Sequence, residues 1–333
     1  MRAQPKGIHL RSGSFGGQVG EDARRASLRN PRSGFLGCCF FSGRRQHRII
    51  AFRAFFCGAS GVFKLALIQM RVDGGAKESN LSRAENFVGA ARAAGADVVL
   101  LPETLNLGWT HRSGHALADE IPGGETCARL QAAAQRHAVF LCAGLVERAG
   151  ERLFNSAVLI GPEGAVLLHH RKLNELDIAH DLYAQGDRLA VAHTPLGTFG
   201  LMICADAFAR GQVVSRTLGL MGAGIILSPC AWAVPADHDN GREPYGRLWL
   251  DNYGPPARDF RMWIAGCSNV GWIDDGPWQG RKCIGCSLVI GPDGEPALRG
   301  PYGVEAETML MVDVTRDSRR TRGDAPDRAG ERS

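Results

Sequence analysis

Short, almost continuous apolar runs alternate with segments of helical periodicity from residue 64 onward, and this alternation constrains the fold most. KLALIQM (64–70) and GIILSPCAW (224–232) are two such runs. Runs that are apolar at every position are typical of strands with both faces buried. The segment 79–95 places apolar residues on one helical face at Leu81, Ala84, Val88 and Ala91. We therefore predict an α/β protein whose sheets are covered by helices.

The same patterns predict the other elements. Further helices are expected at 124–138 and 210–223. Further strands are expected at 97–103, 139–147, 154–161, 165–172, 196–204, 262–271, 284–294 and 308–314. Residues 233–258 are rich in Asp, Pro and Gly, and we interpret them as an excursion before a helix.

Charge is distributed unevenly along the chain. The net charge of +5 combines +9 in residues 1–62, −6 in residues 63–315 and +2 in residues 316–333. We predict a basic, disordered N-terminal extension over 1–62, a folded domain over 63–315 and a charged C-terminal tail over 316–333. A transit peptide or a polyanion-binding arm are the alternatives for 1–62. The mildly acidic body does not favour nucleic acid as a partner.

The cysteine pattern indicates reduced thiols and a cytoplasmic protein. A chain of 333 residues that is 44% hydrophobic needs no disulfide framework. Cys283 and Cys286 form a lone C-x-x-C pair without a second pair at ligand spacing, so no metal is predicted. No apolar run reaches the roughly 20 residues of a membrane-spanning helix, so no membrane partner is expected. The cysteines are Cys38, Cys39, Cys57, Cys127, Cys142, Cys204, Cys230, Cys267, Cys283 and Cys286.

Three of the apolar runs end in a reactive side chain. VVLLPE ends at Glu103, LLHHRK ends at Lys172, and GLMICAD contains Cys204. A carboxylate base, a fixed positive charge and a thiol are the groups needed to attack a carbon–nitrogen bond with sulfur. We expect Cys204 to lie at a strand-to-helix turn, where the helix dipole favours the thiolate.

Other interpretations of these residues stay open at this point. Each of the three occurs often as a structural or solvated side chain. A Cys–His hydrolase would need His180 or His193 as its base. His169 and His170 lie inside an apolar run and are interpreted as strand residues on opposite faces.

The order of these motifs resembles the carbon–nitrogen hydrolase, or nitrilase, superfamily. GGETCARLQAAAQRHAVFLCAGLVER, FNSAVLIGPEGAVLLHHRKL, GIILSPCAW, SNVG and CSLVIGPDGE resemble further family segments in the same order, over residues 63–315. The resemblance implies a four-layer α-β-β-α sandwich of two mixed β-sheets covered by helices. It also implies a homodimer or higher homo-oligomer, and neither a metal nor an organic cofactor.

The resemblance carries roles over to individual residues. Glu103 is the general base, and Lys172 stabilises the oxyanion together with the backbone N–H of Ala205. Cys204 attacks the substrate carbon and becomes a thioester. Many family members add a second acid after the lysine, and here Asp181 and Glu175 are both candidates.

The resemblance also implies where the substrate binds, because the family builds its substrate pocket after the strand that follows the cysteine turn. Trp232 and Asp206 are the pocket candidates, and the charged side chains of the excursion could meet a charged substrate end: Asp237, Asp239, Arg242 and Glu243. Nitrilases proper usually carry Cys-Trp-Glu, whereas this chain has Cys204-Ala205-Asp206, which favours amide or carbamoyl hydrolysis.

The sequence therefore predicts a thiol-dependent hydrolase. Its substrate is expected to be a small linear amide or N-carbamoyl amine, cleaved through a thioester with release of ammonia or an amine. A nitrilase that converts a nitrile to an acid is the alternative enzyme. A catalytically silent nitrilase-like association module is the alternative of another class.

Overall fold

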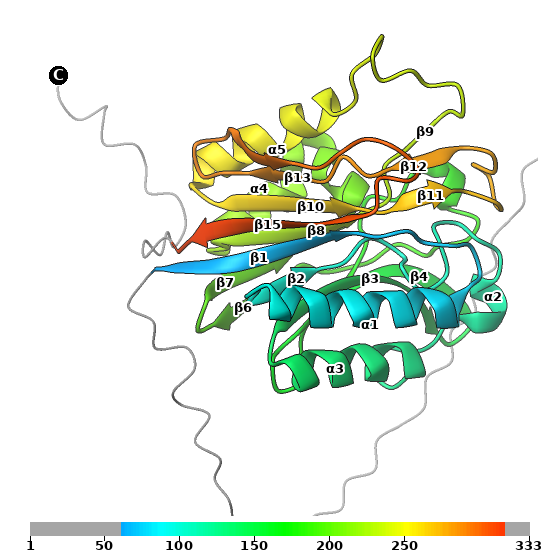
Figure 1. The fold of residues 1–333 in the computed structure, drawn as a ribbon, viewed down its shortest axis with the longest axis horizontal. Coiled ribbons are helices and arrows are strands. Elements are labelled where there is room, and N and C mark those ends of the chain that lie inside the picture. Colours follow the sequence, from blue (N-terminus) through cyan, green and yellow to red (C-terminus); the bar gives the residue numbers. More distant parts are fainter. Residues whose placement is uncertain (1–60, 317–333) are drawn as a thin grey trace, which may run out of the picture. The chain divides into compact units, whose positions relative to one another are not determined.

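Two six-stranded sheets stack face to face at the centre of the fold in the computed structural model, which describes residues 61–316 (Figure 1). The first sheet has the order β15-β1-β2-β3-β4-β5 and the second has the order β14-β13-β10-β8-β7-β6. Both are mixed, because parallel pairs such as β1–β2 and β8–β10 adjoin antiparallel pairs such as β3–β4 and β10–β13. The predictions made for residues 1–60 and 317–333 lie outside the described residues.

Most strands overlap the predicted apolar runs, but the strands at Val191–Thr194, Ala233–Val234 and Pro296–Arg299 were not predicted. The first sheet contains β1 (Val62–Gln69), β2 (Val98–Leu100), β3 (Phe140–Ala149), β4 (Arg152–Ile160), β5 (Val166–Arg171) and β15 (Thr308–Thr315). The second contains β6 (Val191–Thr194), β7 (Gly197–Leu201), β8 (Ile225–Cys230), β10 (Trp263–Ser268), β13 (Leu288–Ile290) and β14 (Pro296–Arg299). A small sheet contains β9 (Ala233–Val234), β11 (Val270–Trp272) and β12 (Lys282–Ile284).

Helices cover the outer face of each sheet (Figure 1). The helices are α1 (Lys77–Ala93), α2 (Gly114–Leu117), α3 (Glu125–His137), α4 (Val213–Leu220) and α5 (Arg247–Phe260). Alternate residues of β1 fill two different cores. Leu65 and Leu67 pack between the sheets, while Ala66 and Ile68 pack in the core that α1 and α3 close. The four-layer α-β-β-α sandwich is confirmed.

Two proline residues mark the clearest departure from the predicted elements. The excursion expected over 233–258 contains most of helix α5, which includes Pro255 and Pro256. Adjacent prolines predict a helix break because they lack the N–H that the helix needs. Here Gln212 donates its side-chain amide to the carbonyl of Asp251, one of the helix acceptors that the prolines leave free. Trp249, Tyr253 and Ala257 form the buried face of α5.

No helix within residues 61–316 is both long and apolar enough to span a lipid bilayer.

Gly144 of β3 allows the segment that carries Glu103 to lie directly against the sheet. The N–H of Leu105 donates to the carbonyl of Gly144, and the N–H of Gly144 donates to the carbonyl of Pro102. A Cβ at position 144 would lie 2.6 Å from the Cα of Glu103 and 2.8 Å from the Pro102 oxygen. A methyl group therefore cannot fit without displacing the backbone of Glu103.

We expect Gly144→Ala to lower the free energy of unfolding by about 1–3 kcal/mol, as overpacking of a filled core does. Gly123→Ala is the matched control, because a Cβ there meets no atom within 4 Å, and it should change stability by less than about 0.5 kcal/mol. Urea unfolding of both variants measures the difference. Equal stability of the two would contradict the close approach of Glu103 to β3.

Candidate active site

Glu103 and Lys172 form an ion pair buried between the ends of two strands. The Lys172 Nζ donates to the Glu103 Oε1 at 2.8 Å, and both side chains are about 1% exposed. The side-chain amide of Asn155 donates to the same Glu103 oxygen at 2.6 Å. Glu103 follows β2 and Lys172 follows β5, so each comes after a strand, as predicted, and the first sheet supplies both charges.

Two carboxylates keep the amine of Lys172 charged. Burial alone acts to lower the pKa of this lysine, but the charges of Glu103 and Glu175 raise the pKa well above its ordinary value. Glu175 Oε2 lies 3.3 Å from the Lys172 Nζ. Lys172 is therefore a fixed positive charge in a dry environment.

Cys204 lies at the turn after β7, in a backbone conformation that non-glycine residues rarely adopt. Its φ angle is 42°, and a short 3-10 helix runs from Cys204 to Phe208. The next residue, Ala205, is buried, and its backbone oxygen accepts a hydrogen bond from the Asn174 side chain at 2.7 Å. Strained positions of this kind are often found at functional sites.

The electrostatic environment of Cys204 links it to the ion pair. A hydrogen bond with Cys230, desolvation and the charge of Glu103 raise the pKa of the Cys204 thiol well above its usual range, while Lys172 acts to lower it. We expected a helix dipole to favour the thiolate, but the segment that begins at Cys204 is a five-residue 3-10 helix, and the pKa of the thiol is raised instead. The sulfur is a thiol beside a carboxylate rather than a preformed thiolate.

Glu175, and not Asp181, is the second acid beside Lys172. The Glu175 carboxylate is buried, and this burial raises its pKa to about 7, with Lys172 opposing and Glu103 reinforcing the shift. Asp181 is exposed, so its prediction as the second acid is wrong. The chain turns into a short 3-10 helix at Asp177–Ala179, which leaves Asp181 on the surface.

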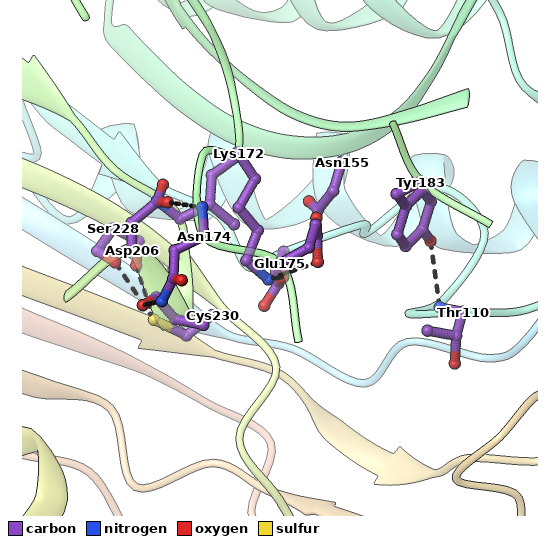
Figure 2. Close-up of polar contacts among 12 residues, drawn as sticks. Thr110, Asn155, Lys172, Asn174, Glu175, Tyr183, Asp206, Ser228 and Cys230 are labelled. Carbon is purple, nitrogen blue, oxygen red and sulfur yellow. Dashed lines mark hydrogen bonds and ion pairs between the residues drawn. The ribbon is translucent and has the colours of Figure 1, made fainter. Parts of the chain in front are cut away.

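Asp206 has a structural role instead of the predicted pocket role. It is fully buried, and its carboxylate accepts hydrogen bonds from the N–H groups of Ile203, Leu173 and Asn174. Its Oδ2 also lies 2.8 Å from the His170 Nε2. Asp206 therefore ties the Cys204 turn to the segment after Lys172, and no oxygen remains for a substrate (Figure 2).

The remaining pocket candidates divide between core and surface. The Trp232 ring stacks on Trp249 at 4.5 Å in the core below α4 and α5, and its buried ring N–H has no hydrogen-bond partner among residues 61–316. Its place in a substrate pocket stays a prediction. The charged side chains of the excursion instead line a surface hollow beside Tyr245, and they are Asp237, Asp239, Arg242 and Glu243.

Neither histidine that was considered as the base of a Cys–His hydrolase lies in the buried site. His180 and His193 are exposed, and His193 contacts Thr198, so neither is the base of the predicted alternative. His169 contacts Glu147, whereas His170 contacts Asp206, as expected for strand residues on opposite faces. Within residues 61–316 no group of three or more His, Cys, Asp or Glu side chains could hold a metal ion.

Sequence reasoning missed two residues of this site. Asn155 contacts Glu103, and Cys230 hydrogen-bonds to Cys204. Asn155 is visible in the sequence only as one polar residue within the apolar run FNSAVLIG, where a buried amide needs a partner. Cys230 carried no distinguishing signal among ten cysteines.

The raised pKa of Glu175 predicts a pH-dependent stability. The folded protein holds a proton on Glu175 up to about pH 7, whereas an unfolded glutamate releases it near its ordinary pKa of 4.5. Unfolding therefore becomes easier as pH rises from about 4.5 to 7, because the folded state binds more protons in this window. Glu175→Gln should flatten this part of the stability curve, and denaturant unfolding at several pH values measures it. An unchanged slope in the variant would contradict the assignment.

Asp206→Ala should lower the free energy of unfolding by about 3–5 kcal/mol, since it leaves a buried histidine and three N–H groups without their acceptor. Asp181→Ala is the control at an exposed aspartate, with an expected change under about 0.5 kcal/mol. Thermal and urea unfolding compare the two. Similar losses in both would show that the Asp206 carboxylate does not tie the two segments together.

Comparison with known proteins places this arrangement in a family. The family model described as carbon-nitrogen hydrolase matches residues 64–322. The omega-amidase NIT2 of Mus musculus is 33% identical over 267 residues, which cover 76% of this chain and 88% of that protein. A nitrilase of Pyrococcus abyssi is 31% identical over 237 residues, which cover 70% of this chain and 82% of that protein.

Solved structures agree at the level of the fold. An amidase from Nesterenkonia sp. aligns with a TM-score of 0.63 at 23% identity, over 78% of this chain and 93% of that chain. Saccharomyces cerevisiae Nit3, a member of branch 10 of the nitrilase superfamily, aligns with a TM-score of 0.63 at 19% identity, over 76% of this chain and 90% of that chain. The chain belongs to the carbon–nitrogen hydrolase, or nitrilase, superfamily.

Proposed function

We propose that this hydrolase cleaves the C–N bond of a small linear amide or N-carbamoyl amine through a thioester on Cys204. The observation that carries the proposal is the buried contact of 2.8 Å between Lys172 and Glu103, with the Cys204 thiol coupled electrostatically to both. These side chains supply a nucleophile, a base and a fixed positive charge in one place. The similarity to omega-amidases supports an amide substrate.

In the first half of the reaction, Glu103 takes the proton of the Cys204 thiol as the sulfur attacks the carbonyl carbon. The negative charge that develops on the carbonyl oxygen is stabilised by Lys172 and by the backbone N–H of Ala205. The tetrahedral intermediate then collapses as Glu103 returns the proton to the leaving nitrogen. Ammonia or an amine leaves, and the acyl group stays on Cys204 as a thioester.

In the second half, Glu103 takes a proton from a water molecule that attacks the thioester carbon. The carbon–sulfur bond breaks, the sulfur regains its proton, and the acid product leaves. The raised pKa of Cys204 fits this scheme, because a thiol that keeps its proton at rest needs a base at the moment of attack. Glu175, with its pKa of about 7, lies beside Lys172 and can hold a proton near the reacting groups.

Conversion of a nitrile to an acid is the second candidate function. The 31% sequence identity to the Pyrococcus abyssi nitrilase favours this candidate. Ammonia release from matched panels of aliphatic amides, N-carbamoyl amines and nitriles separates the two activities. A turnover preference for the nitriles would favour this candidate over amide hydrolysis. We also propose a homo-oligomer in the cytoplasm, which sedimentation of the purified protein and localisation of a tagged chain would test.

Cys204→Ala should lower amide turnover by at least about 1,000-fold, because the variant lacks the nucleophile. Cys286→Ala is the matched control, since Cys204 and Cys286 are the partly exposed cysteines of residues 61–316. The control should keep most of the turnover. Loss of the same activity in both variants, or turnover that survives in Cys204→Ala, would exclude a Cys204 thioester.

Alkylation distinguishes an enzyme from a silent association module. Iodoacetamide should label Cys204 in the folded protein, and a substrate amide should protect this residue while leaving Cys286 unprotected. Peptide mapping by mass spectrometry identifies the labelled thiols. Labelling that no amide, carbamoyl or nitrile compound changes, together with no ammonia release, would favour the silent module.

A further inference from the structure

Asn155 contacts both members of the buried ion pair through different atoms. Its side-chain Nδ2 donates to the Glu103 Oε1 at 2.6 Å, and its backbone oxygen accepts from the Lys172 N–H at 2.8 Å. The residue is about 1% exposed and lies in β4, between the strands that lead to the two charges. Figure 2 shows its side chain together with those of Lys172 and Glu175.

The two hydrogen bonds to Glu103 converge on one oxygen. Lys172 and Asn155 both donate to Oε1, and none of the residues 61–316 donates a hydrogen bond to Oε2. Two hydrogen bonds to one carboxylate oxygen fix the rotation of the carboxylate about its Cγ–Cδ bond. Its second oxygen is thereby kept in one position and keeps its lone pairs for a proton.

We propose that Asn155 is a positioning residue for the base, which fixes Glu103 through Oε1 so that Oε2 receives the proton of Cys204. Lys172 alone would hold the carboxylate with one flexible contact, and that contact is shared with Glu175 at 3.3 Å. The amide of Asn155 comes from β4, which is paired on both sides within the first sheet, and gives the second contact. The hydrogen bond from the Lys172 N–H to the Asn155 oxygen keeps the backbone of Lys172 in register with β4.

The Asn155 side chain is better suited to this role than to core packing. Its own Oδ1 is buried and has no partner within the described residues. A buried amide with only half of its hydrogen bonds made is unfavourable for folding, so its retention here needs a compensating use. A leucine of similar volume would fill the space but would release Glu103.

The role rests on the proposed function, and Asn155→Ala tests it with three measurements. We expect kcat for the amide to fall about 10- to 100-fold with KM changed less than about threefold, as misplacement of a catalytic group does. Iodoacetamide should also label Cys204 more slowly at pH 7.

Ser156→Ala is the matched control on the same strand. Ser156 is buried next to Asn155 and donates to the buried carboxylate of Glu147, so the control also removes one charge-assisted hydrogen bond. Its side chain points to the opposite face of the sheet, away from Glu103. We expect kcat, KM and Cys204 labelling to stay within about twofold of the unaltered protein.

Asn155→Asp separates the donor from the space that the side chain fills. The aspartate keeps the size of the side chain but replaces the donor with a second carboxylate, so it should be at least as slow as Asn155→Ala. A rise in KM with unchanged kcat in Asn155→Ala would show that Asn155 binds substrate, and equal losses in Ser156→Ala would show a general effect on the sheet. Either outcome overturns the positioning role.

The labelling measurement needs no substrate and therefore keeps the two proposals apart. If no amide is turned over but Cys204 labelling still slows in Asn155→Ala, the proposed reaction fails and the positioning role stands. If amides are turned over and both Asn155 variants match the unaltered protein, the reaction stands and the positioning role fails.

Discussion

The buried contact between Glu103 and Lys172 is the interaction on which the rest of the site depends. Removing two charges from water is expensive, and their attraction offsets this only with good geometry and additional hydrogen bonds. The additional partners are Asn155 on Glu103 and Glu175 on Lys172. The pair therefore constrains three segments of the first sheet at once, because each must deliver its side chain to within hydrogen-bonding distance.

The second sheet is joined to this pair by contacts that are equally buried. The N–H of Glu103 donates to the carbonyl of Cys230 at the end of β8, which bridges the two sheets at the site. Asp206 fixes the Cys204 turn to the residues that follow Lys172. The sandwich thus joins the Cys204 turn of the second sheet to the residues that follow Lys172 in the first.

The ionisable groups around the ion pair differ in how strongly they hold a proton. Lys172 stays positive, Cys204 keeps its proton, and Glu175 titrates near neutrality. A dry site strengthens each of these interactions relative to water. It also makes the proposed reaction sensitive to small displacements of these groups. Gly144 belongs to the same structural unit, because its missing side chain lets Glu103 approach β3.

The sequence alone determined the apolar runs, the buried face of α1 at Leu81, Ala84, Val88 and Ala91, and the reactive residues at three strand ends. These follow from local periodicity, which a single segment carries by itself. Only the tertiary structure decided between Glu175 and Asp181 as the acid beside Lys172. It also showed that Asp206 holds two backbone segments together instead of lining a pocket. The same is true of helix α5, which continues across Pro255 and Pro256. The contacts of Asp206 and of helix α5 join segments more than 30 residues apart. Glu175 contacts the nearby Lys172, but its burial depends on the packing around the ion pair, which exists only after the sheets have stacked.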